Sequence, residues 1–175
     1  EHLTNFIAVG EAAADIVNGI IVAIGEYDLD QAMSFSFQSE EDGRTKNVVI
    51  IENSEYEGIT WEFQLTMTDE DGGTGLQVFW NNSPVKGIAI MNPYNIHRGC
   101  VAAKCEGYYW VNENTMYRVD YSEAETAYEA QMTVYIAGLN LPVVKPEEYD
   151  RFTMETMKMF AGKNGDIVDV YGNSN

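Results

Sequence analysis

The chain has 175 residues, and its 28 acidic residues against 10 Lys and Arg give a formal net charge of −18. Such a surface repels phosphate groups, which argues against nucleic acid and anionic lipid headgroups as partners. The hydrophobic content of 45 % suffices for one core, so we expect a single domain over residues 1–175. No apolar run reaches the roughly 18 residues of a membrane span.

Residues 3–25 are predicted to form an amphipathic helix. Thr4 is a candidate N-cap, and Gly25 is a candidate stop. Apolar side chains recur at three- and four-residue spacing at Phe6, Val9, Ala13, Ile16, Val17, Ile20 and Ile24. This spacing places them on one helix face, which we expect to pack on a sheet.

Residues 33–137 are predicted to form an antiparallel sheet. The strongest signal is strict alternation with polar residues at Ile59, Trp61, Phe63, Leu65 and Met67. Successive strand side chains point to opposite faces, so we expect these five to share one dry face. A second hairpin is predicted over 117–137, and the connections between strands are short and polar. This order of strands is typical of a meander.

The C-terminal part is predicted to contain a helix over about 146–161 and a short strand over about 166–171. Pro146 and the two glutamates after it suit the first turn of a helix. The predicted fold is mainly β (α+β): an antiparallel up-and-down barrel, or a strongly curled meander sheet, of about eight strands. One helix from the N-terminal part of the chain and one from the C-terminal part are predicted to pack on this sheet. A two-layer α+β sheet is the alternative.

Cys100 and Cys105 are the two cysteines of the chain. We predict a disulfide between them, which favours an oxidising compartment. Closing so short a loop with a disulfide would stabilise the folded protein by about 2 kcal/mol. The alternatives are two unrelated thiols or half of a metal site, for which His97 as one nearby histidine supplies too few ligands. A signal peptide is expected to have been removed ahead of Glu1, and a lipid anchor upstream of that residue stays open.

The irregular segment 92–111 is the predicted ligand-binding region. Aromatic rings beside polar groups hold sugars and flat apolar molecules. The candidate residues in this segment are Tyr94, His97, Arg98, Tyr108 and Trp110. The alternative is structural, with the aromatic residues packing at the start of a strand and His97 bonded to solvent or backbone.

Motifs for catalysis, phosphate binding and metal binding are absent from the sequence. The acidic turn that begins at Asp69 fails as an EF-hand, because its twelfth position is Trp80 rather than Glu. We therefore expect no cofactor and no metal. The mid-strand acids Glu62, Asp120 and Glu129 resemble the carboxylates of hydrolases in type, but the sequence does not pair them.

Residues 86–95 (KGIAIMNPYN) and 169–175 (DVYGNSN), with the general layout, resemble uncharacterised cell-envelope lipoproteins and secreted proteins of gut Bacteroidetes. The resemblance implies an envelope location and no particular activity, and no functional residue carries over from it. We expect a non-enzymatic extracytoplasmic module that binds a small apolar or carbohydrate-like ligand, or a partner protein. The alternatives are a hydrolase that uses the scattered carboxylates or the His97 region, and a purely structural surface protein.

Overall fold

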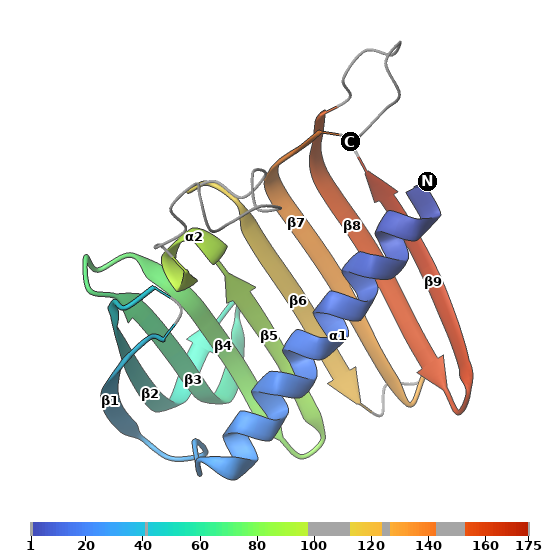
Figure 1. Cartoon of the computed structure of the whole chain (residues 1–175). Coiled ribbons are helices and arrows are strands. Elements are labelled where there is room, and N and C mark those ends of the chain that lie inside the picture. The colour runs from blue at the N-terminus through green and yellow to red at the C-terminus, as the bar shows by residue number, and fades with distance from the viewer. Residues whose placement is uncertain (1, 41, 98–112, 124–126, 143–152, 175) are drawn as a thin grey trace.

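A computed structural model describes residues 2–40, 42–97, 113–123, 127–142 and 153–174. A long helix, α1 (His2–Glu26), crosses one face of a nine-stranded antiparallel sheet (Figure 1). The strands are β1 Met33–Gln38, β2 Thr45–Tyr56, β3 Ile59–Asp69, β4 Thr74–Asn82, β5 Val85–Met91, β6 Met116–Glu123, β7 Ala130–Pro142, β8 Thr153–Asn164 and β9 Ile167–Ser174. A short helix, α2 (Pro93–Ile96), follows β5.

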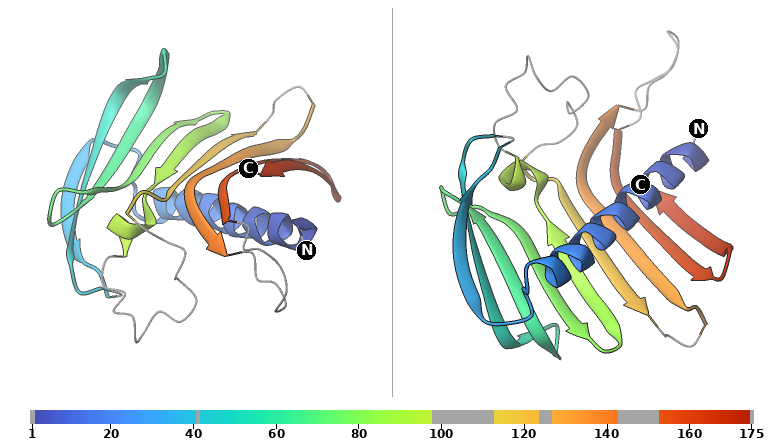
Figure 2. Two further views of the ribbon diagram at one scale, coloured as in Figure 1. Left: turned by 90° about the horizontal axis from the view of Figure 1, so that it is seen from above. Right: turned by 60° about the horizontal axis from the view of Figure 1, so that its bottom comes forward.

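The strands lie in the sheet in the order in which they occur in the chain, so the predicted antiparallel meander is confirmed. The predicted barrel is wrong, because β1 and β9 form the two ends of an open sheet and do not pair (Figure 2). The reason is that α1 lies against the face that would line a barrel, and this contact buries the apolar side chains without closure. The molecule thus has a sheet layer and a helix layer.

The predicted C-terminal helix is wrong over residues 153–161, which belong to strand β8. Met157, Met159 and Ala161 are buried in alternation with more exposed neighbours. This strand pairs with β7 on one side and β9 on the other. Hydrogen bonds from two neighbouring strands and the burial of one face outweigh the helix propensity of its methionines. Residues 143–152 lie outside the described part of the chain.

The predicted N-terminal helix is confirmed, and the apolar residues of its stripe from Ala13 onward pack on the sheet. Ala13 and Val17 contact the cluster built from β5 to β8. Ile20 and Ile24 pack against the cluster built from β2 to β5. Removing this surface from water, at about 25 cal/mol per Å², is the main force that holds the helix on the sheet. Across the described residues, no helix has the length and apolar character that crossing a membrane requires.

The sheet face away from α1, here called the outer face, carries a smaller cluster. It contains Trp61, Phe79 and Ile88. Phe63 instead stacks on Trp80, at 5.3 Å between ring centroids, in the cluster beneath α1. The prediction that Trp61 and Phe63 share one dry face is therefore wrong.

The change of face coincides with a bend in the β2–β3 hairpin. Asn53 has a φ of 54°, which is the left-handed region that strands avoid. Beyond it the hairpin tip lies on the outer face, where Tyr56 stacks on Phe79 with 4.2 Å between centroids. A local bend thus moves Trp61 from the helix side of the sheet to the outer side.

Candidate functional site

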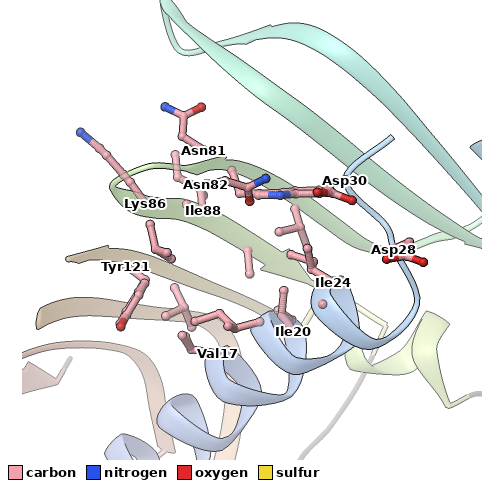
Figure 3. Close-up of a pocket in the computed structure, with 18 residues that line it drawn as sticks. Val17, Ile20, Ile24, Asp28, Asp30, Asn81, Asn82, Lys86, Ile88 and Tyr121 are labelled. Carbon is pink, nitrogen blue, oxygen red and sulfur yellow. The ribbon is translucent and has the colours of Figure 1, made fainter. Parts of the chain in front are cut away.

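A cavity of about 380 Å³ lies between α1 and the sheet (Figure 3). This volume is within the range of roughly 300–1,000 Å³ that is usual for small-molecule sites. Its wall is apolar, with Val17, Ile20 and Ile24 from the helix and Val78, Ala89 and Val119 from the sheet. These are the same kinds of side chain that hold α1 in place, so the cavity is a gap within the helix–sheet contact.

The gap arises from one row of residues across three strands. Trp80 on β4 pairs with Gly87 on β5, and Gly87 pairs with Tyr121 on β6. Directly paired residues present their side chains to the same face of a sheet. A glycine therefore stands between two aromatic residues, and the space above it beneath α1 is not filled. A Cβ atom at Gly87 would lie 2.8 Å from the carbonyl oxygen of Phe79, so a larger residue fits only if the β4–β5 backbone shifts.

Polar residues also line the rim of the cavity, and Figure 3 shows Lys86 and Asp28 far apart on opposite sides of the site. Asn81, Asn82 and Lys86 come from the β4–β5 hairpin, and Asp28 and Asp30 come from the segment after α1 (Figure 3). Both aspartates are exposed to solvent. The site thus has an apolar wall and a polar rim, and the rim residues carry more negative than positive charge.

Two aromatic residues of the wall also carry polar atoms. The hydroxyl of Tyr121 donates a hydrogen bond to Glu123 at 2.8 Å. Burial, together with this carboxylate, raises the pKa of Tyr121 to about 12, so the hydroxyl keeps its proton at neutral pH. Trp80 is 5 % exposed, and its indole Nε1 has no hydrogen-bond partner.

The described residues of the predicted binding segment lie elsewhere. Tyr94 is in α2 and is exposed, and the backbone N–H of His97 donates to the carbonyl of Pro93 at the end of this helix. Neither Tyr94 nor His97 is among the residues that line the cavity. The other predicted residues lie outside the described part of the chain: Arg98, Cys100, Cys105, Tyr108 and Trp110. Their grouping and the disulfide stay predictions.

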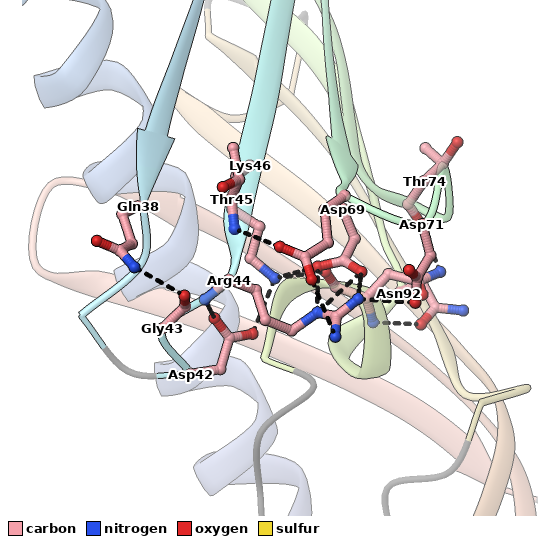
Figure 4. A network of polar contacts seen from close by, with 12 residues as sticks. Gln38, Asp42, Gly43, Arg44, Thr45, Lys46, Asp69, Asp71, Thr74 and Asn92 are labelled. Carbon is pink, nitrogen blue, oxygen red and sulfur yellow. Dashed lines mark hydrogen bonds and ion pairs between the residues drawn. The ribbon is translucent and has the colours of Figure 1, made fainter.

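A buried ion network lies at the turns beside α2 (Figure 4). The ammonium of Lys46, which is 1 % exposed, donates to Asp42 and Asp69 at 2.8 Å each. The guanidinium of Arg44 binds the other oxygen of Asp69 at 2.7 Å. These contacts, that of Arg44 above all, hold the pKa of Asp69 well below its usual range. The pKa of Lys46 is raised, because its bonds to the two aspartates outweigh the burial that opposes its charge.

This network fixes the start of the predicted binding segment. Lys46 also donates to the backbone carbonyl of Asn95 in α2 at 3.2 Å. The side chain of Asn95 in turn donates to the carbonyl of Thr74 at 3.0 Å. The buried part consists of Lys46 and its two aspartates, and Arg44, which is 24 % exposed, also binds the exposed Asp71 at 2.7 Å. An ion network in which each buried charge has an opposite partner suits a structural role.

This network was not predicted from the sequence. A signal for it was present, because Lys46 is in phase with the buried Val48 and Ile50 on β2. The pairing of Lys46 with Asp69 in the sheet register could then have followed from the β2–β3 hairpin. A charged residue in phase with buried neighbours needs an opposite charge close by.

The three mid-strand carboxylates have separate local partners. Glu62 accepts a hydrogen bond from the backbone N–H of Asn82 at 2.8 Å. Asp120 pairs with Arg118 at 2.7 Å. Glu129 accepts from the backbone N–H of Gly165 at 3.0 Å in another part of the sheet. The described residues contain no group of three or more His, Cys, Asp or Glu that could hold a metal ion.

Fold and cavity together define an open antiparallel meander sheet with an apolar cavity beneath one long helix. Comparison of the chain with known proteins gave no matching family model, no match among curated proteins and no match among solved structures. The cavity and its surroundings are the features of the molecule that bear on function.

Proposed function

We propose that this protein is a non-enzymatic binding module that holds a small apolar molecule between α1 and strands β4 to β6. The supporting observation is the cavity of about 380 Å³, with its apolar wall and polar rim. A ligand that fills it moves apolar surface out of water, at about 25 cal/mol per Å². The rim would keep a polar end of the ligand in contact with solvent.

We further propose an extracytoplasmic location. It is supported by the predicted disulfide between Cys100 and Cys105. The aromatic segment 92–111 is a second candidate surface for a carbohydrate-like ligand or a partner protein. The ion network that holds Asn95 supports this proposal, because it gives the segment a fixed starting point.

The test of the cavity uses the neutral fluorescent probe N-phenyl-1-naphthylamine. We expect saturable binding with a stoichiometry of one probe per chain. Ala89→Leu should weaken binding at least about fivefold, because the larger side chain occupies the cavity at a buried lining position. The same substitution at the exposed Ala137 on β7 is the matched control and should leave binding unchanged.

Circular dichroism checks that each variant is folded. Ile20→Trp fills the cavity from the helix side and provides an independent measurement if Ala89→Leu does not fold. Absence of saturable binding to the wild-type protein would refute the proposal. Equal binding by the variants at Ala89, Ile20 and Ala137 would also refute it.

A further inference from the structure

The C-terminal end of α1 lies at the cavity and carries negative charge. Gly25, in the last turn of the helix, is one of the lining residues. A helix has a partial negative charge at its C-terminal end, which lysine or arginine in the last turn commonly balances. The last turn of α1 contains no basic residue, and the chain has no lysine or arginine before Arg44. Neither the helix nor the segment that follows it therefore supplies a positive side chain at this end.

Two carboxylates add to this negative charge. Asp28 and Asp30 lie in the segment after α1 and line the same cavity. Figure 3 shows both on the side of the site where Ile24 lies. Within the part of the chain that the structure describes, neither carboxylate forms an ion pair. The helix end of the cavity thus combines the C-terminus of α1 with two carboxylates that no cation of the described chain neutralises.

The basic residue of the lining lies on the other side of the cavity. Lys86 comes from the β4–β5 hairpin, and Figure 3 shows it on the same side as Tyr121, across the site from Asp28. Between the two sides the wall is apolar. An apolar molecule with one positive group is therefore bound best when that group lies at the helix end, far from Lys86 and close to the two carboxylates.

We propose that the molecule bound in the cavity is an organic amine in its cationic form, whose apolar body lies against the wall and whose ammonium group lies beside Asp28 and Asp30. An ammonium group is a hydrogen-bond donor only, so it matches the carboxylate oxygens at this end. The cavity supplies the site, and the charge at its helix end selects the ligand. The net charge of −18 attracts cations to the molecule as a whole. This inference rests on the proposed function and names the chemical class of its ligand.

The test compares three compounds with the same bicyclic body by their displacement of N-phenyl-1-naphthylamine. Tetralin is uncharged, 2-aminotetralin carries an ammonium group at neutral pH, and 1,2,3,4-tetrahydro-2-naphthoic acid carries a carboxylate. In the wild-type protein we expect the amine to bind at least about fivefold more tightly than the acid, because the two differ in the sign of the charge that meets Asp28 and Asp30.

Asp28→Asn combined with Asp30→Asn removes both charges and keeps the size of the side chains. Asparagine also tolerates the left-handed backbone at position 28, where φ is 50°. This rim variant should weaken binding of the amine about fivefold, near the upper limit for exposed charge pairs, and leave binding of tetralin unchanged.

Glu155→Gln combined with Asp166→Asn is the matched control. It removes two exposed acidic charges from the β8–β9 hairpin, and neither residue lines the cavity. The control has the same net charge as the rim variant, so it separates the local effect from the general attraction of a cation to an acidic protein. It should leave the binding of all three compounds unchanged.

Nuclear Overhauser effects between ligand and wild-type protein locate the ammonium group without any variant. The proton on the carbon that bears the nitrogen of 2-aminotetralin should show an effect to the methyl groups of Ile24, beside the two carboxylates. It should show none to the ring of Tyr121, on the side of Lys86. This measurement decides the question even if the rim variant fails to fold.

The inference is overturned if the acid binds as tightly as the amine, or if the rim variant and the control weaken the amine equally or not at all. It is also overturned if the nitrogen-bearing carbon lies beside Tyr121. In each of these cases saturable tetralin binding leaves the proposed function standing. Failure of the fluorescent probe and of all three compounds to bind would remove the proposed function itself.

Discussion

The guanidinium of Arg118 on β6 donates hydrogen bonds to both carboxylate oxygens of Glu57 at the tip of the β2–β3 hairpin. The nitrogen–oxygen distances are 2.5 and 2.9 Å. Asp120 binds the same guanidinium at 2.7 Å. The tip therefore reaches from its own hairpin to β6 across the outer face. Trp61 and Phe79 are packed beneath it. This ion pair and the aromatic cluster hold the bent hairpin in one position.

Glu57→Gln should loosen the hairpin tip. The Arg118 guanidinium lowers the pKa of Glu57, so the carboxylate is charged and paired at neutral pH. Because the pair is partly exposed, we expect a small change in global stability and a clear increase in amide hydrogen exchange over residues 54–61. Exchange measured by mass spectrometry checks this. Glu55→Gln, at an exposed position of the same hairpin, should leave exchange unchanged, and equal exchange in the two variants would contradict the role of Glu57.

Local periodicity predicted the elements whose pattern is unambiguous. The stripe of α1 fits only a helical period, and the alternation at Phe63, Leu65 and Met67 fits a strand with one dry face. Residues 153–161 fit both periods, because Met154, Met157 and Phe160 have helical spacing while Met157, Met159 and Ala161 alternate. Pairing with β7 and β9 decides the outcome, and such pairing is a tertiary effect.

The cavity could not be predicted either, because it also depends on the pairing of strands in the folded sheet. It depends on Gly87 standing between Trp80 and Tyr121, and these residues belong to three strands. The sequence indicates each strand separately. However, β5 and β6 are joined by a long connection, so the sequence does not fix the register between them. The buried pair of Lys46 and Asp69 was easier to predict from the sequence, because the short β2–β3 turn fixes the register of the two strands.

Lys46→Met should strongly destabilise the protein. The substitution keeps a side chain of similar length but leaves Asp42 and Asp69 buried without the ammonium that binds both. Removing one partner of a buried ion pair costs about 3–5 kcal/mol of unfolding free energy. Urea unfolding followed by circular dichroism measures this cost. Lys163→Met, at an exposed position on β8, should change stability by less than about 0.5 kcal/mol; a comparable loss there would show that the effect is not specific to the network.

The contribution of Asp69 to stability should depend on acid pH. Hydrogen bonds from Arg44 and then Lys46 lower the pKa of this carboxyl in the folded protein. A lowered folded-state pKa stabilises the fold above the unfolded value of about 3.9, and this stabilisation is lost as the pH falls further. Asp69→Asn should therefore be less stable than the wild type at neutral pH. The difference in unfolding free energy between the two should narrow below about pH 4.

Urea unfolding at a series of pH values from neutral down to acid measures this difference. Glu155→Gln, at an exposed position on β8, serves as the control. It should show little difference from the wild type at any pH in the series. A gap between Asp69→Asn and the wild type that stays constant through the acid range would contradict the role assigned to the ionised carboxylate.

Gly→Ala substitutions should have opposite effects at two positions of this chain. At Gly87 the added Cβ would lie 2.8 Å from the backbone oxygen of Phe79, so the β4–β5 pair must shift. Such overpacking costs about 1–3 kcal/mol. At Gly19 in α1 nothing lies within 4 Å of the added atom, and alanine should stabilise the helix by about 0.5–1 kcal/mol.

Thermal unfolding of the two variants measures the two opposite changes in stability, and the same Gly→Ala replacement is made in each case. A lower melting temperature for Gly87→Ala and a higher one for Gly19→Ala is the expected result. Gly87→Ala should also weaken N-phenyl-1-naphthylamine binding, because the shifted strands change the wall between Trp80 and Tyr121. Gly19 does not line the cavity, so its variant should bind the probe as the wild type does. If Gly87→Ala were as stable as the wild type and bound the probe equally well, the cavity would not owe its shape to this glycine.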